Sequence, residues 1–342
     1  MKQNSNSNMN IKNVKKLSKN SDFQTIGIIT RISSRTDRNG NLFWDVNIAD
    51  QTGDLEGKAW GNSSWVNRQG GDKFFIDPNN CGFKIEGLTA GILGHVVDFR
   101  DQLQYTFTEI HILDQNKFPP KNYTKRSPLS QEFLEKTFKD LIDEISNEEI
   151  KNFLNAIFFK YNLWEKYSVW PAAVLLHHAY AAGLLEHSLS VAIGARDMAK
   201  HYEAFKIPVD IDIVIAGALL HDIGKIEAYN ADIAPSINIQ GNVIEHIFLG
   251  YGMFVKFAEK ENLSENVKTA LAHIIISHHG RKEFGSPVLP GTPEAFIVSA
   301  ADDIDFKMSY WKNQIENLAP QTEVTEYLQM IDRRLWRGTK EQ

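Results

Sequence analysis

The chain has 342 residues, a length typical of two domains, and its 42% hydrophobic and 23% charged residues are ordinary for a globular protein. The single cysteine excludes an intramolecular disulfide framework. The lack of a long apolar run or a signal pattern argues against a membrane span and predicts a cytoplasmic location. The net charge of −6 argues against binding nucleic acid through bulk positive charge, so such binding would need local groups, a basic tail or a metal.

Residues 1–20 are rich in Asn, Ser and Lys and have little to bury, so we expect a disordered basic tail. Residues 21–115 predict an all-β domain, because short alternating or β-branched runs are separated by turn signals. The predicted strands are Thr25–Ile32, Leu42–Ile48, Leu55–Trp60, Gly82–Leu88, Gly94–Phe99 and Gln104–Leu113. So many strands in so short a segment predict a small closed barrel, similar to an OB-fold that binds nucleic acid.

Alternation in the second predicted strand separates a core face from a solvated face. The core face holds Leu42, Trp44, Val46 and Ile48, and the other face holds Phe43, Asp45 and Asn47. An aromatic ring on the solvated face of such a barrel is a candidate platform for stacking a base, so we expect Phe43 to contact nucleic acid. Lys58 is a further candidate, and Trp60 and Tyr105 are weaker ones, because simple packing is the favoured explanation of these two rings.

Residues 116–130 are polar and basic with three prolines, and they predict a linker. From residue 131 to residue 342 the apolar periodicity is helical. Ser130 and Ser146 are predicted N-caps, the latter with Glu149 at the third helical position.

An adjacent pair, His221 and Asp222, ends the apolar run Ile213–Leu220, which predicts a buried helix. An imidazole and a carboxylate side by side offer two ligands to one divalent cation. Lys225 follows within one helical turn, where an ammonium group is useful if the metal acts on a phosphate.

Further histidines and acids in apolar, helical contexts extend this pattern along the chain. They are His187, His246, His278, His279 and the acidic group Asp302, Asp303 and Asp305. A lone histidine on an apolar helix is usually a core residue, but five segments in this order resemble the HD-domain phosphohydrolase pattern.

The combination of an OB-fold with Gly183-Leu184-Leu185-Glu186-His187, His221-Asp222-Ile223-Gly224-Lys225 and Ser277-His278-His279-Gly280 resembles the YhaM-type 3′→5′ exoribonucleases. The resemblance covers roughly residues 21–315. It implies a first metal site of His187, His221, Asp222 and Asp302, and a second of His246, His278 and His279, with Asp222 able to bridge two ions. Asp303 and Asp305 remain alternatives to Asp302, and His177 and His178 are candidates for orienting ligands.

Mixed imidazole and carboxylate ligands suit Mn²⁺, Co²⁺, Fe²⁺ or Zn²⁺ better than Mg²⁺ alone, and we expect Mn²⁺, with one or two ions per site. The sequence lacks a phosphate-binding glycine loop and a Ser-His-Asp or Cys-His arrangement, so metal-activated water is the expected nucleophile, with Asp222 and Lys225 as catalytic residues. The predicted substrate is single-stranded RNA, with DNA as an alternative, and a homo-oligomer remains open.

Two other functions fit the same pattern. One is a phosphohydrolase acting on nucleotides or cyclic dinucleotides, with a regulatory OB-fold. The other is a non-enzymatic protein that binds single strands and has an inert HD site.

Overall fold

The computed structural model describes residues 8–99, 102–174, 178–231, 235–319 and 321–339. The chain divides into two compact units, one within Met1–Arg126 and the other containing Ser127–Ala231 and Pro235–Gln342. The boundary at Arg126 lies inside the segment that we predict to be a linker. Among the described helices, none is both long enough and apolar enough to cross a membrane.

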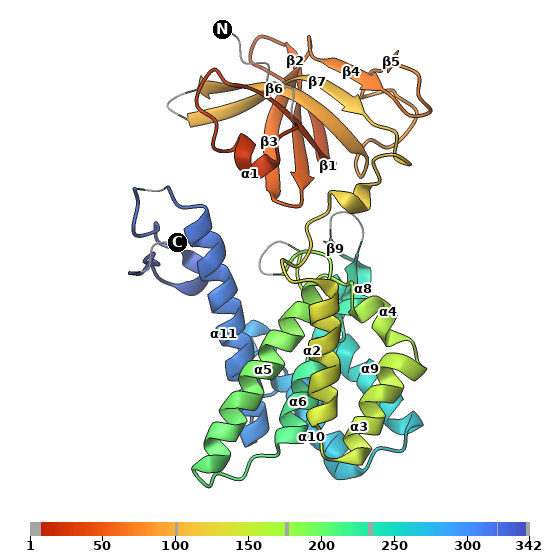
Figure 1. Ribbon diagram of the computed structural model, residues 1–342, viewed down its shortest axis with the longest axis vertical. Coiled ribbons are helices and arrows are strands. Elements are labelled where there is room, and N and C mark those ends of the chain that lie inside the picture. The colour runs from red at the N-terminus through yellow and green to blue at the C-terminus, as the bar shows by residue number, and fades with distance from the viewer. Residues whose placement is uncertain (1–7, 100–101, 175–177, 232–234, 320, 340–342) are drawn as a thin grey trace. The chain divides into compact units, whose positions relative to one another are not determined.

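The first unit is a closed five-stranded barrel (Figure 1). Its strands are β1 (Asp22–Thr36), β2 (Leu42–Asp50), β3 (Gly53–Trp60), β6 (Thr89–Phe99) and β7 (Gln102–Ile112), in the sheet order β3-β2-β1-β6-β7. Neighbours pair antiparallel, and a parallel contact between Lys58 of β3 and Thr106 of β7 closes the barrel. This order with one parallel closure is that of an OB-fold, as predicted.

Two short strands add to the sheet beside the C-terminal part of β7, and the sequence pattern did not predict either of them. They are β4 (Ser64–Asn67), parallel to β7, and β5 (Phe74–Phe75), paired with β4. The predicted strand Gly82–Leu88 is wrong, because this segment forms turns before β6 begins. Its apolar side chains instead pack onto the barrel from the loop, as Ile85 does.

The predicted core face of β2 is confirmed for Trp44, Val46 and Ile48, which lie in the barrel core. It is wrong for Leu42, which is 38% exposed because it begins the strand at the rim of the barrel.

The prediction of a disordered tail is wrong for residues 8–20. Helix α1 (Ile11–Val14) begins at the N-cap Asn10, and its two apolar residues, Ile11 and Val14, are fully buried in the barrel core. The backbone N–H of Ile11 donates to the Asp50 carboxylate at 2.8 Å. The average composition of this segment is too polar to indicate an ordered structure, but its contact with the barrel buries the two apolar residues. Residues 1–7 of the predicted tail lie outside the described residues.

The second unit is helical and adds one short ladder between β8 (Tyr229–Asn230) and β9 (Ser236–Ile237). Its α-helices are α2 (Gln131–Glu144), α3 (Glu148–Asn155), α4 (Leu163–Tyr167), α5 (Gly183–Ala204), α6 (Ile211–Leu220), α7 (Lys225–Ala228), α8 (Ile239–Val243), α9 (His246–Lys260), α10 (Glu265–Ser277) and α11 (Pro293–Glu316). A π-helical turn (Ala156–Lys160) follows α3, and short 3₁₀ turns are Pro120–Asn122 in the first unit, and Lys282–Phe284 and Gln329–Ile331 in the second.

Helix α6 is the centre of the helical unit. Every residue from Ile213 to Leu220 is buried, and α6 packs against α5, α10 and α11. A helical run that is apolar all round, as Ile213–Leu220 is, can only be accommodated where other helices cover it on every side. The buried Tyr167 hydroxyl also donates to the Leu219 carbonyl at 2.8 Å, so the end of α6 is held from α4 as well.

The predicted N-caps are half right. The Ser130 side chain accepts from the Phe133 N–H and caps α2. Ser146 does not cap α3, because its hydroxyl donates to Asp212 on α6 and Asn147 takes the capping position.

Gly224 lets the turn after α6 approach α9 closely. A Cβ atom there would lie 1.9 Å from the His246 carbonyl oxygen and 2.4 Å from the Gly250 nitrogen. Both contacts are backbone atoms in the first turns of α9, so they cannot move aside without shifting the helix.

We predict that Gly224→Ala lowers the free energy of unfolding of the helical unit by at least about 1–3 kcal/mol, because the added methyl overpacks backbone against backbone. Gly194→Ala is the matched control, since a Cβ atom at this position of α5 meets nothing within 4 Å. It should stabilise the helix by about 0.5–1 kcal/mol. Urea unfolding followed by helical circular dichroism measures the stability of both variants. Equal stabilities for the two would contradict the close backbone packing at Gly224.

Candidate metal centre

The polar residues that the HD pattern predicts lie mostly at helix ends around α6. His221 and Asp222 follow the last residue of α6, His246 begins α9, and His278 and His279 follow the last residue of α10. His187 lies near the start of α5, and Asp302 lies within α11. Helices that meet at their ends bring residues far apart in the chain into one buried space.

One group of four ligand candidates surrounds Nε2 of His187. This nitrogen lies 3.2 Å from Asp222 Oδ2, 3.3 Å from Asp302 Oδ1 and 3.2 Å from His221 Nε2. His221 Nε2 is itself 3.3 Å from Asp222 Oδ2 and 3.9 Å from Asp302 Oδ1. The structure therefore brings together the four residues that the resemblance assigns to the first metal site.

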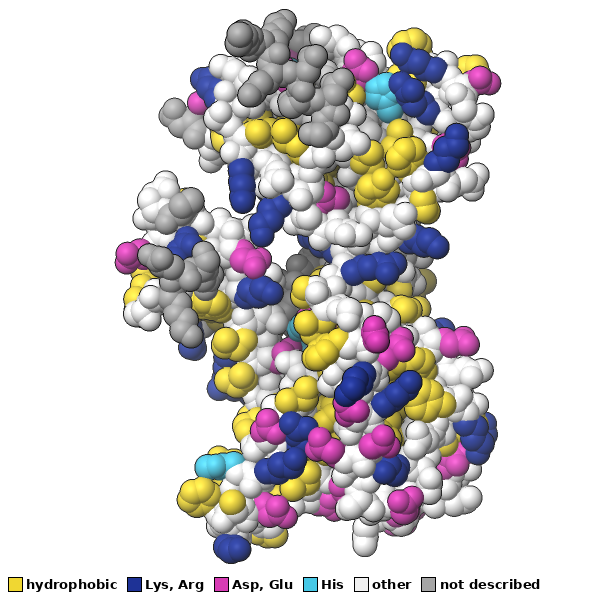
Figure 2. Space-filling view, in the orientation of Figure 1, with side chains coloured by type: hydrophobic (Ala, Val, Ile, Leu, Met, Phe, Trp, Pro, Cys, Tyr) yellow, Lys and Arg dark blue, Asp and Glu magenta, His cyan; other side chains and the backbone are white. Residues whose placement is uncertain are grey.

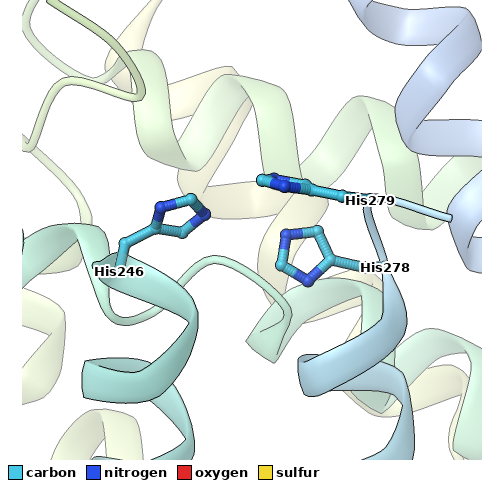
Figure 3. A group of neighbouring side chains, drawn as sticks. All are labelled: His246, His278 and His279. Atoms are coloured by element: carbon cyan, nitrogen blue, oxygen red, sulfur yellow. The ribbon is translucent and has the colours of Figure 1, made fainter. Parts of the chain in front are cut away.

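A second group lies against the other oxygen of Asp222. Asp222 Oδ1 is 3.4 Å from His246 Nε2 and 3.5 Å from His278 Nε2. Figure 3 shows the ring of His246 facing those of His278 and His279, whose candidate ligand atoms lie within 4.8 Å of one another. The two oxygens of Asp222 thus face different imidazole groups, the geometry that a bridging carboxylate requires.

Three buried atoms at this second group have no hydrogen-bond partner among the described residues: Asp222 Oδ1, His246 Nε2 and His278 Nε2. A buried polar atom without a partner costs about 1–3 kcal/mol. Asp222 Oδ1 lies 3.4 Å from one of these nitrogens and 3.5 Å from the other, so the three atoms offer lone pairs of the kind that a divalent cation binds. The residues present therefore fit a divalent metal.

The opposite nitrogen of every candidate imidazole is occupied. Nδ1 of His221, His278 and His279 lies 2.6–2.7 Å from the carbonyl oxygens of Ala218, Ile275 and Phe284, respectively. Nδ1 of His187 lies 2.8 Å from Asp305, and Nδ1 of His246 lies 2.7 Å from Glu245. Because each acceptor requires a proton on Nδ1, Nε2 is left as the nitrogen that can bind a metal.

Lys225 lies inside this charged cluster and not on the surface. Its Nζ is buried and 2.5 Å from Asp222 Oδ2. Burial alone would raise the pKa of the Asp222 carboxyl, but Lys225 and then His221 outweigh it and hold that pKa well below the usual range. Burial would lower the pKa of Lys225, but Asp222 raises it above its ordinary value. Both groups are therefore charged at neutral pH.

Burial also dominates at His279, where it lowers the pKa to about 3, with a further contribution from the neighbouring His278. The ring is therefore neutral at physiological pH, the form in which imidazole binds a metal.

The three acids of α11 have different surroundings. Asp302 faces His187 and His221, whereas Asp303 is exposed and pairs with Lys307 one turn further on. Asp305 contacts His187 from the far side of its ring. His178 Nε2 lies 3.1 Å from Asp305, and His177 lies outside the described residues.

The barrel carries a groove of about 530 Å³ across β3, β6 and β7. Its lining includes the predicted contacts Lys58 and Trp60. The sequence reasoning missed the rest: Asn62, Ser63, His95, Val97, Asp98, Phe99, Gln104, Thr106 and Thr108. Alternation along β7 could have found Gln104, Thr106 and Thr108, because they alternate with the core residue Phe107.

Two predicted nucleic-acid contacts do not line this groove. The Phe43 ring is only 8% exposed, because Trp60 packs on it at a centroid distance of 5.2 Å and Lys58 lies 4.9 Å above it. Tyr105 lies on the core side of β7, edge-on to Phe23. A solvated strand face does not guarantee an exposed ring, because neighbouring long side chains cover it.

Comparison with known proteins gives one family match, in the helical unit. Residues 184–307 match the family model of the HD domain, which confirms the HD domain predicted for the helical half.

Solved structures match more distantly. The second OB-fold domain of replication protein A from Methanococcus maripaludis is 16% identical, covering 31% of this chain and 94% of that one, with a TM-score of 0.21. A replication protein A heterotrimer bound to ssDNA is 12% identical, covering 34% and 75%, with a TM-score of 0.19. Aspartyl tRNA synthetase from Entamoeba histolytica is 8% identical, covering 79% and 59%, with a TM-score of 0.24.

Proposed function

We propose that the protein is a metal-dependent 3′→5′ exoribonuclease of the YhaM type, which hydrolyses single-stranded RNA and releases nucleoside 5′-monophosphates. One observation carries the proposal. The two oxygens of Asp222 face two separate groups of imidazoles, and within the described part of the chain Asp222 Oδ1, His246 Nε2 and His278 Nε2 are buried without a hydrogen-bond partner. Two adjacent metal positions are the arrangement that phosphodiester hydrolases use on both sides of a scissile phosphate.

The residues that would hold the metals are His187, His221, Asp222 and Asp302 on one side and His246, His278 and His279 on the other, with Asp222 shared. Bound there, divalent ions, of which we favour Mn²⁺, would lower the pKa of a water molecule and neutralise phosphate charge. The protein contributes a dry, rigid setting, since five of these side chains are buried at helix ends and their imidazoles are held through Nδ1.

Lys225 supplies positive charge directly. Its ammonium group donates to Asp222 and has further N–H bonds to offer, so it can donate to a non-bridging oxygen of a phosphate seated at Asp222. Local charge matters because acidic and basic side chains are mixed over the face of the helical unit seen in Figure 2. That face gives a polyanion no broad basic surface.

The groove of the barrel suits a single strand. Trp60 is half-buried and offers part of its indole, while Lys58 adds a cation beside it. Stacking requires exposed base faces, which a duplex does not present, so we infer a preference for single strands.

A phosphohydrolase acting on small nucleotides is the second candidate. It is favoured by one observation: all the candidate ligands and Lys225 belong to the helical unit, so the centre is complete without the barrel. Substrate length separates the two functions.

We predict that the full chain with Mn²⁺ shortens a 5′-labelled RNA oligonucleotide from its 3′ end, giving a ladder on a sequencing gel. A chelator should abolish the ladder. Asp222→Asn keeps the size of the side chain but removes the shared charge, so its rate should fall more than about 100-fold, beyond what loss of an orienting partner gives.

Asp303→Asn is the control for this substitution, because Asp303 is exposed and pairs only with Lys307 in the described contacts. It should retain the rate of the unmodified protein. A folded Asp222→Asn protein with full activity would overturn the proposed site, and turnover of mononucleotides without shortening of RNA would favour the second candidate.

The groove gives a separate prediction. Trp60→Ala should raise KM for an RNA oligonucleotide by the equivalent of about 1–3 kcal/mol, the loss of one stacked base, and leave turnover of a dinucleotide unchanged. Phe75→Ala is the control, since Phe75 is more exposed than Trp60 but lies on β5 outside the groove. If both variants bind RNA alike, the groove is not the RNA site.

A further inference from the structure

Asp305 lies behind the first group of ligands, on α11. Its Oδ2 is 2.8 Å from His187 Nδ1 and 3.1 Å from His178 Nε2, and its Oδ1 accepts from the Ser190 hydroxyl at 2.5 Å. The side chain is only 10% exposed. A carboxylate with two or three donors and little exposure has one orientation, so the position of the His187 ring is defined from α11.

The contact also determines which nitrogen of His187 faces the metal centre. A carboxylate accepts hydrogen bonds and does not donate, so His187 Nδ1 must carry the proton. The His187 ring then presents an unprotonated Nε2 to Asp222 Oδ2 and Asp302 Oδ1 when a cation lies between them. Without an acceptor on Nδ1 the other tautomer would compete, and its N–H would point at the metal position.

His187 differs from the other imidazoles in the charge and burial of its acceptor. His221, His278 and His279 rely on neutral backbone carbonyls, and the carboxylate of Glu245 that holds His246 is 58% exposed and therefore screened by water. A buried carboxylate makes an imidazole a stronger ligand than a carbonyl does. His187 also lies on α5, a different helix from the α6 segment that His221 and Asp222 follow, and Asp305 holds its ring from a third helix, α11.

We infer that Asp305 is a positioning residue for the first metal site: it holds His187 in the Nδ1–H tautomer and increases the affinity of that site for a divalent cation. This inference rests on the proposed function for the identity of the site, but it concerns metal affinity and can be measured without a nuclease assay. Ser190 has a supporting part, because its hydroxyl orients the carboxylate from the same helix as His187.

The test is the dissociation constant for Mn²⁺, measured on the full chain by competition with a chelator. Asp305→Ala should weaken the tighter Mn²⁺ site by about 10–100-fold, the range for losing such a partner. Asp305→Asn, which keeps an oxygen acceptor but loses the charge, should give a smaller loss. Asp303→Asn, two residues away and exposed, should match the unmodified protein.

Nitrogen chemical shifts of the histidine rings in the Zn²⁺-loaded protein provide a readout that a purely structural role would not move. His187 should show Nδ1 protonated in the unmodified protein and a mixed or altered state in Asp305→Ala. If Asp305→Ala fails to fold, the same measurements on Asp305→Asn and on Ser190→Ala, whose side chain is exposed, test the inference. Ser190→Ala should weaken Mn²⁺ binding at the first site several-fold.

Unchanged Mn²⁺ affinity and unchanged His187 shifts in a folded Asp305 variant would overturn the inference. A failure of the proposed function would give a different result. The unmodified protein would still bind Mn²⁺ more tightly than the Asp305 variants do, but it would not cleave RNA. The two outcomes are therefore distinguishable in the same set of proteins.

Discussion

The candidate metal centre depends on the carboxylate of Asp222, which lies between two groups of imidazoles. It is buried at the end of α6, its Oδ2 faces His187, His221 and Lys225, and its Oδ1 faces His246 and His278. Burial of an anion among imidazoles is unfavourable unless cations compensate it, and Lys225 compensates only one oxygen. Among the described residues, the other oxygen and two imidazole nitrogens have no hydrogen-bond partner, which is unfavourable for stability and is the arrangement expected of groups that bind a ligand.

The packing of the apolar residues of α6 makes this energetically unfavourable arrangement possible. Because every residue from Ile213 to Leu220 is buried, the helix has one position in the bundle, and its end delivers His221 and Asp222 without freedom to move. Gly224 then allows the next turn to touch the start of α9, which carries His246. Rigid packing of apolar side chains therefore determines distances between polar ones.

Much of this was accessible from the sequence because local patterns carry it. Apolar periodicity located α6, and the order of histidines and acids indicated which side chains to test. Asp305, kept as an alternative to Asp302, lies three residues after it and therefore on the same face of the helix, whereas Asp303 lies on another face. Contacts between distant segments were not accessible: the covering of Phe43 by Trp60, and the burial of Ile11 and Val14, depend on how strands and loops meet in three dimensions.

The central claim is that Asp222 is shared between two metal ions. Crystals of the full chain soaked in Mn²⁺, with diffraction recorded at the manganese absorption edge, test it most directly. We predict two anomalous peaks, one beside Asp222 Oδ2 among His187, His221 and Asp302 and the other beside Oδ1 among His246, His278 and His279. Peaks that avoid Asp222, or no peak within this cluster at saturating Mn²⁺, would contradict it.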